Sequence, residues 1–158
     1  MFNGVIINAD SLQLFKGLDI LTAQPSAEDL KKCPHKLYGV LGPNDRCTAA
    51  RFRDIAFREI DQTFGSGKLP IIVGGTGFYL KSLSEGLSPI PEVPGEIRSA
   101  AIALHLKLKN KDFHKLLSEK DPDMAAKLNQ NDTQRMIRAW EVLQATGKSL
   151  SYWQKLPL

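Results

Sequence analysis

Cysteine is scarce in this 158-residue chain, which contains only Cys33 and Cys47. Because neither has a second cysteine at a metal-binding spacing, we expect reduced thiols rather than a disulfide framework or a zinc site. Long apolar runs are also missing, since no segment approaches the roughly 20 residues that span a bilayer. The N-terminus, MFNGVIINAD, lacks the basic start of a signal peptide. These absences predict a cytoplasmic globular protein with no membrane partner and leave its oligomeric state open.

Charge is unevenly distributed along the chain. Residues 1–95 contain ten Lys and Arg against ten Asp and Glu, whereas residues 96–158 contain eleven against seven, which accounts for the whole net charge of +4. A basic C-terminal part is typical of a segment that binds a polyanion such as a nucleic acid. A lysine-rich helical surface that faces only solvent explains the same charge equally well.

Apolar periodicity predicts an α/β N-terminal part. Buried strands are expected at 5–8 and 69–73 and a weaker strand at 36–41. The spacing also predicts an amphipathic helix at 48–64 with Gly65 as its C-cap. Ser26 begins a capping box for a short helix that ends before Pro34. Strands that alternate with helices indicate a parallel sheet.

The C-terminal part is predicted to be helical. Three prolines between Leu87 and Gly95 indicate an extended linker. After this linker, the pattern favours helices at 96–109, 111–119, 122–128 and 132–145, the last ended by Gly147.

Polar residues follow two of the predicted strands. Asp10 and Ser11 come after the first strand, and Gly74-Gly-Thr-Gly77 comes after the strand at 69–73. Because ligands bind outside the carboxyl ends of parallel strands, we expect both groups to face one crevice. Asp10 would then be a general base or a metal ligand and Thr76 a hydrogen-bond donor, while the glycines would let backbone N–H groups approach a phosphate or a base. A plain helix N-cap and a plain tight turn are the simpler alternatives.

Other polar and aromatic residues give weaker signals. Arg135 and Arg138 share one face of a predicted helix and could bind phosphates or bases, or only solubilise that face. His105 and His114 match no metal spacing and are predicted to lie on the surface. We expect the two tryptophans, Trp140 and Trp153, to pack among the helices.

Several segments of the chain occur together in one known family. In chain order they are Asn8-Ala-Asp-Ser-Leu-Gln13, Thr22-Ala-Gln-Pro25, Pro34-His35, Ala49-Ala-Arg-Phe52, Gly67-Lys-Leu-Pro-Ile-Ile-Val-Gly-Gly-Thr-Gly-Phe-Tyr79 and Asn131-Asp-Thr-Gln-Arg-Met-Ile-Arg-Ala139. Over nearly its whole length the chain resembles the tRNA dimethylallyltransferases. The resemblance implies a partial P-loop-type, nucleotide-binding α/β core at 1–88 and a helical tRNA-binding insertion at 89–158.

The resemblance also implies a reaction and its residues. The exocyclic amine of the adenosine beside the anticodon attacks dimethylallyl diphosphate, with Asp10 as the general base and Thr76 as the second catalytic residue. The adenosine must leave its stack to be reached. The implied partners are the tRNA anticodon stem-loop and dimethylallyl diphosphate, and the implied cofactor is Mg²⁺, for which the sequence identifies no ligands. The implied tRNA contacts are Asp10, Ser11, Leu12, Gln13, Thr76, Arg98, Gln134, Arg135, Met136, Ile137 and Arg138.

Two parts of the family pattern are missing from the sequence. It contains neither the Gly-x-x-x-x-Gly-Lys-[Ser/Thr] loop that binds the diphosphate nor the family's C-terminal portion. We therefore expect an internal fragment whose sheet has unpaired backbone groups, so that it folds poorly or associates and transfers dimethylallyl groups slowly or not at all. A non-catalytic tRNA-binding remnant is the main alternative. A nucleotide or shikimate-type kinase fits less well, because it too requires a phosphate loop.

Overall fold

The computed structural model describes residues 3–157, and the chain divides between Leu87 and Ser88 into two compact units. We refer to residues 3–87 as the α/β unit and to residues 88–157 as the helical unit. The division lies one residue before the boundary between residues 88 and 89 that the family resemblance implies. Across residues 3–157, no helix combines the length and the apolar character needed to cross a membrane.

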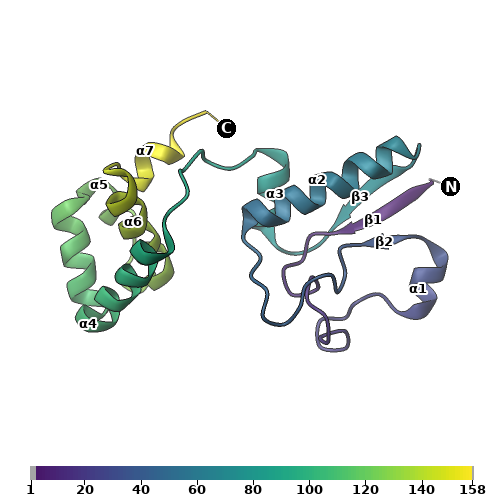
Figure 1. Ribbon diagram of the computed structural model, residues 1–158, viewed down its shortest axis with the longest axis horizontal. Helices are drawn as coiled ribbons and strands as arrows, with labels where there is room; N and C mark the ends of the chain where they lie inside the picture. The colour runs from purple at the N-terminus through teal and green to yellow at the C-terminus, as the bar shows by residue number, and fades with distance from the viewer. Residues whose placement is uncertain (1–2, 158) are drawn as a thin grey trace. The chain divides into compact units, whose positions relative to one another are not determined.

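The α/β unit contains a three-stranded parallel sheet with helices, as the alternating pattern predicted (Figure 1). Its strand order is β2-β1-β3, and β1 pairs in parallel with both neighbours. Helix α2 packs against β1 and β3, and α3 packs against α2. The elements are β1 (Gly4–Asn8), α1 (Ala27–Lys32), β2 (His35–Lys36), α2 (Ala49–Gly65), β3 (Leu69–Val73) and α3 (Gly77–Ser84).

The core of the α/β unit lies on one face of the sheet. Val5 and Ile7 of β1 are buried together with Phe52 of α2, and Ile72 of β3 packs against them. Phe52 stacks in parallel on Tyr79 of α3, with ring centroids 4.0 Å apart. The apolar positions of the predicted helix at 48–64 therefore cover this face, as amphipathic spacing requires.

The other face of β3 is open, which corrects the prediction of a buried strand. In the parallel register Ile6 pairs with Ile71, and Ile7 pairs with Ile72, so successive residues of β3 alternate between the core face and the opposite face. On the opposite face Leu69, Ile71 and Val73 are between 39% and 45% exposed. An apolar run indicates a strand, but it does not indicate whether a second layer covers it.

The predicted strand at 36–41 is wrong beyond Lys36. β2 ends there because Leu37 and Gly39 have φ angles of 63° and 56°, in the left-handed region that extended strands do not use. Leu41 instead forms an isolated parallel bridge with Phe15. The C-cap of α2 is also shifted, from Gly65 to Ser66.

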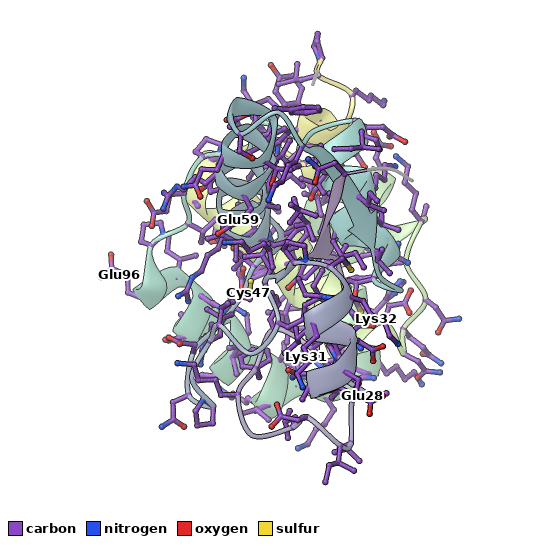
Figure 2. The ribbon with its side chains drawn as sticks, turned by 90° about the vertical axis from the view of Figure 1, so that its right-hand side faces the viewer. Glu28, Lys31, Lys32, Cys47, Glu59 and Glu96 are labelled. Carbon is purple, nitrogen blue, oxygen red and sulfur yellow. The ribbon has the colours of Figure 1, made fainter. Side chains whose placement is uncertain are left out.

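Helix α1 begins at the predicted capping box. The Ser26 hydroxyl accepts a hydrogen bond from the Asp29 N–H, and the Asp29 carboxylate accepts one from the Ser26 N–H. Helix α1 buries none of its residues, and Figure 2 shows Glu28, Lys31 and Lys32 along it. Local capping therefore defines this helix more than burial does.

The helical unit begins with the extended linker and contains no strand within residues 88–157, as predicted. Lys109, with φ 63°, breaks α4 into two helices at the boundary between the two predicted segments. Helix α5 is shorter than the segment 122–128 predicted for it, whereas Gly147 ends α6 in the expected left-handed conformation. The elements are α4 (Gly95–Lys120), α5 (Pro122–Ala125), α6 (Thr133–Thr146) and α7 (Leu150–Gln154).

The core of the helical unit forms mainly between α4 and α6. Phe113 and Leu117 of α4 are fully buried against Met136 of α6, and the Phe113 ring lies 5.8 Å from that of Trp140. Trp153 packs against the same cluster. The prediction that both tryptophans pack among helices is therefore confirmed.

The two histidines of the helical unit are half-buried, which corrects their predicted surface placement. His114 Nε2 lies 3.2 Å from the Ala125 carbonyl oxygen and 3.0 Å from that of Leu128. His105 Nε2 lies 2.7 Å from Asn110 Oδ1, beside the break at Lys109. Both rings therefore satisfy polar groups where the helices turn.

Candidate functional site

Asn8, the last residue of β1, organises the backbone that carries Asp10. Its side chain is fully buried, and its Oδ1 accepts a hydrogen bond from the Asp10 N–H at 2.8 Å. Its Nδ2 donates to the carbonyl oxygens of Asp10 and Leu37, each at 3.0 Å. Because one amide uses both of its polar atoms, it holds the backbone N–H and C=O of Asp10 and joins this residue to the segment after β2.

Thr76 joins the ends of β1 and β3. Its hydroxyl oxygen accepts a hydrogen bond from the Ser11 N–H at 2.9 Å, and its hydroxyl donates to Ser11 Oγ at 3.2 Å. Thr76 is also the N-cap residue of α3, but its side chain makes no capping hydrogen bond. The Thr76 hydroxyl thus binds Ser11, which lies 65 residues earlier in the sequence after β1, and does not cap its own helix.

Gly74 allows the two strand ends to approach each other closely. A Cβ at this position would lie 2.6 Å from Asp10 N and closer still to the carbonyl group of Ala9. The Ala9 N–H donates to the Val73 carbonyl oxygen at 2.7 Å, and the Thr76 N–H donates to that of Ala9 at 3.2 Å. The role of this glycine is therefore a close approach between backbones, whereas the sequence had suggested an approach to a ligand.

The Asp10 carboxylate lies at this junction and is partly exposed. Its Oδ1 accepts a hydrogen bond from the Leu12 N–H at 2.9 Å, which forms a local turn. A Cβ built at Gly75 would lie 3.4 Å from Oδ2, so the second oxygen faces the glycine loop. Within residues 3–157 Oδ2 accepts no hydrogen bond, which leaves it able to take a proton from a ligand. Asp10, Ser11 and Thr76 therefore share one edge of the sheet, as the parallel topology predicted.

Leu12 and Gln13, which follow Ser11, lie in different environments. The Leu12 side chain is exposed at this edge. Gln13 is half-buried, and its Nε2 donates to the carbonyl oxygens of Thr22 at 2.8 Å and Ala23 at 3.2 Å. Ala23 has a φ of 51°, so Gln13 holds a turn that the backbone alone would disfavour.

Two tyrosines lie in the electrostatic field of Asp10. Burial raises the pKa of Tyr38, and the negative charge of Asp10 raises it further. Burial also raises the pKa of Tyr79, together with its interactions with Cys47 and the charge of Asp10. The Tyr79 hydroxyl donates to the Cys47 carbonyl oxygen at 3.3 Å. Both phenols therefore stay neutral and act as packing and hydrogen-bonding groups near the carboxylate.

Two of the predicted nucleic-acid contacts of the helical unit, Arg98 and Arg138, pair with one buried carboxylate. Glu141 of α6 is only 3% exposed, and its two carboxylate oxygens face two arginines. Arg138 donates to Oε2 at 3.2 Å, and Arg98 Nε of α4 lies 3.8 Å from Oε1. Arg135 is 74% exposed and pairs at 3.7 Å with Asp132. Gln134 is exposed as well.

Met136 and Ile137 do not lie on this surface, which corrects their prediction as tRNA contacts. Met136 is fully buried and Ile137 is 6% exposed, and both belong to the core cluster of the helical unit. Helical periodicity gives the reason, because successive residues of α6 point to different faces and the apolar pair points inward.

The residues in the described range do not form a magnesium site. Among residues 3–157 no group of three or more His, Cys, Asp and Glu side chains is placed to hold a metal ion. The Asp10 carboxylate alone offers too few oxygen ligands for Mg²⁺. Magnesium therefore stays a prediction from the resemblance.

The fold and the site together define an α/β protein whose polar side chains gather at its parallel strand ends, followed by a helical unit in which two arginines share one buried glutamate. The sequence matches the profile described as IPP transferase over residues 13–157, and the chain belongs to this family. Relatives include the tRNA dimethylallyltransferase of Rhodospirillum centenum, 50% identical over 96% of this chain, and that of Paramagnetospirillum magneticum, 50% identical over 99%. The family resemblance is therefore confirmed.

Solved structures agree with this family. A structure described as eukaryotic dimethylallyltransferase acting on tRNA covers 99% of this chain with a TM-score of 0.82 and 27% identity. The full-length tRNA isopentenylpyrophosphate transferase of Bacillus halodurans covers 93% of it with a TM-score of 0.53 and 34% identity. The chain spans about half the length of the curated relatives it matches, 48% and 50% for the two named above.

Two residues of these arrangements were missed by the sequence analysis. The apolar pattern predicts Asn8 only as the last residue of a strand, although an asparagine that ends an apolar run is a polar group that must find buried partners. Glu141 follows the Arg135–Arg138 segment by three residues, a spacing that allows an ion pair on one helix face. Nothing in the sequence indicates that Glu141 is buried.

Proposed function

We propose that this chain provides the adenosine-binding and anticodon-binding parts of a tRNA dimethylallyl transfer. The observation that carries the proposal is the junction of Asp10, Ser11 and Thr76 across two parallel strand ends, in a chain that belongs to the IPP transferase family. The substrates are an adenosine beside a tRNA anticodon and dimethylallyl diphosphate.

Asp10 is the general base of the proposed reaction. The lone pair of the adenine exocyclic nitrogen forms the new C–N bond to the allylic carbon, and the C–O bond to diphosphate breaks. The bonding electrons leave with diphosphate, and a proton of the amine passes to the Asp10 carboxylate. Oδ2 suits this role because Oδ1 is occupied by the Leu12 N–H.

Ser11 and Thr76 position the adenosine in this proposal. The Thr76 hydroxyl donates to Ser11 Oγ, so the Ser11 hydroxyl proton is available for a ring nitrogen of the base. The exposed Leu12 side chain offers an apolar surface for a base that has left its stack. Gln13 acts indirectly, because it holds the turn at Thr22 and Ala23.

The helical unit contacts the anticodon stem-loop through charge. Arg98, Arg135 and Arg138 are at least partly exposed, and guanidinium groups bind phosphates in a bidentate manner. The excess of Lys and Arg within residues 96–158 adds a favourable field for a polyanion.

Diphosphate binding is the weak point of the proposed reaction in this polypeptide. The printed sequence contains no Gly-x-x-x-x-Gly-Lys-[Ser/Thr] motif to neutralise the leaving group. Electrostatic stabilisation of a leaving group is worth several kcal/mol of barrier, roughly 3–4 for one donor. The 158-residue chain assayed by itself should therefore bind the stem-loop and transfer the dimethylallyl group slowly.

The test uses the purified chain, a synthetic anticodon stem-loop RNA and labelled dimethylallyl diphosphate. We expect RNA binding that weakens steeply with salt, slow labelling of the RNA, and loss of that labelling in Asp10→Asn with binding retained. Equal labelling by wild type and Asp10→Asn would exclude Asp10 as the base. Rapid labelling by the wild-type chain would exclude an impaired activity.

A non-catalytic tRNA-binding remnant is the second candidate function. The missing phosphate-loop motif favours it, because binding needs only the arginines whereas transfer needs the leaving group to be neutralised. Salt-dependent RNA binding without any labelling would select the remnant.

A further inference from the structure

We infer that Glu141 is a positioning residue that presents Arg98 and Arg138 as one anion-binding pair for the tRNA backbone. The inference rests on the proposed function, because it assumes that the helical unit meets an RNA. The inference gives an acidic residue a favourable role in binding RNA, although its negative charge by itself would weaken the binding of a polyanion.

The geometry of the network supports a shared holder rather than two separate pairs. Each oxygen of the one buried carboxylate faces a different arginine, Arg98 from α4 and Arg138 from α6. These arginines keep 53% and 43% of their side-chain surface exposed. A guanidinium group has five N–H donors, so one edge can face Glu141 while another faces a phosphate.

The energetics explain why the buried carboxylate of Glu141 is paired with arginines. A buried charge without a partner is strongly unfavourable, and two cations around one carboxylate leave a net charge of +1 at the surface. Arg98 and Arg138 lose side-chain freedom when they are held, so less conformational entropy remains to be lost when an anion binds.

Arg135 provides a contrast on the same helix. Its partner Asp132 is 37% exposed in its side chain, and the two charges lie 3.7 Å apart. An exposed pair of this kind contributes little and holds neither side chain firmly. Arg135 is therefore a solvated charge, whereas Arg98 and Arg138 are oriented.

The key experiment compares Glu141→Gln with Glu119→Gln in the whole chain. Glu119 is exposed near the end of α4 and makes no ion pair within residues 3–157, so both variants raise the net charge by one. If charge alone mattered, both would bind the anticodon stem-loop RNA slightly more tightly. We expect Glu119→Gln to do so and Glu141→Gln to bind about three- to tenfold more weakly, with a salt slope smaller by about 1 to 2.

A second experiment, a double-mutant cycle on the two arginines, does not depend on whether the Glu141→Gln variant folds. Arg98→Gln and Arg138→Gln are made singly and together, and RNA affinity is measured for each. If the arginines act as one pair, the double variant loses clearly less than the product of the two single losses. Losses that multiply would overturn the inference, as would unchanged RNA binding by a folded Glu141→Gln.

A measurement without RNA separates this inference from the proposed function. Side-chain Nε–H relaxation in NMR should show Arg98 and Arg138 more ordered than Arg135, and Glu141→Gln should abolish the difference. If the wild type shows this order and binds no stem-loop RNA, the proposed function fails and the RNA role of Glu141 fails with it. If RNA binds but the three arginines are equally mobile, only the inference fails.

Discussion

The α/β unit and the helical unit bury their apolar residues to different degrees. In the α/β unit, α2 covers one face of the sheet while Leu69, Ile71 and Val73 of β3 remain exposed on the other. In the helical unit, the large apolar residues with exposed side chains are only Ile102, Leu106 and Tyr152 among residues 88–157. The helical unit therefore completes its core with its own residues, whereas the α/β unit keeps an apolar strand at its edge.

The two units also hold their polar residues by different means. In the α/β unit, hydrogen bonds of the Asn8 amide hold the backbone of Asp10, and the absence of a side chain at Gly74 lets the two strand ends approach closely. In the helical unit, a buried carboxylate orients long side chains from two helices. The first arrangement suits chemistry that needs fixed atoms, and the second suits binding of an extended polyanion.

The largest expected effect separates the stabilities of the two units. Phe113→Ala should destabilise the helical unit by about 3–5 kcal/mol, because it empties a fully buried site beside Trp140. Both tryptophans belong to the helical unit, so tryptophan fluorescence in urea reports this unfolding selectively. Phe52→Ala, the matched change in the α/β unit, should shift the far-UV circular dichroism transition and leave the fluorescence midpoint in place. A common shift of both signals would show that the units unfold together.

The second prediction concerns the close approach of the ends of β1 and β3 at Gly74. Gly74→Ala should destabilise the α/β unit by about 1–3 kcal/mol, because its Cβ has no room beside Ala9 and Asp10. Gly77→Ala is the control, since a Cβ there meets nothing within 4 Å and the residue begins α3. Circular dichroism melts of the two variants should differ clearly. Equal melting temperatures would mean that the strand ends separate easily.

The open face of β3 leads to a prediction about association. Ile71→Thr should weaken self-association of the chain about fivefold, which corresponds to roughly 1 kcal/mol of apolar burial lost between copies. Ile102→Thr is closely matched, because the two isoleucines are 39% and 40% exposed and belong to different units. Sedimentation velocity over a concentration series measures both. An equal effect of the two changes would show that general hydrophobicity, and not the edge strand, causes association.

The sequence predicted those features that follow from local pattern and strand topology. Asp10 and Thr76 were expected at one edge, because parallel strands place their carboxyl ends together and the apolar runs mark where each strand ends. The capping box at Ser26 and the left-handed Gly147 were predictable because their chemistry is local. These signals lie within a few residues of the feature that they predict.

The features that were missed depend on distant neighbours. Leu37 adopts a positive φ in a hydrogen-bonded segment that also holds Asn8, and leucine is not a residue type that indicates this conformation. Gly39, two residues later, weakened the strand pattern without marking where the strand ends. Met136 and Ile137 lie between two arginines of a recognised motif, so the motif suggested a surface although packing buries both side chains. In the sequence Glu141 looks like any helical glutamate, because one of its partners, Arg98, belongs to a different helix and is brought to it only by the fold.

The smallest expected effect is a local response of α1 to acid, confined to the α/β unit. Hydrogen bonds from Ser26 and then the Lys32 pair lower the pKa of Asp29 from 3.8 to about 2. A lowered folded-state pKa means that the carboxylate stabilises the helix above the unfolded value and that this contribution is lost as the pH falls from about 4 to about 2. An NMR titration should therefore show the Ser26 and Asp29 amides shifting near pH 2. Ser26→Ala removes the main cause, so the Asp29 midpoint should move back toward 3.8, and an unchanged midpoint would mean that the capping box does not hold the carboxylate.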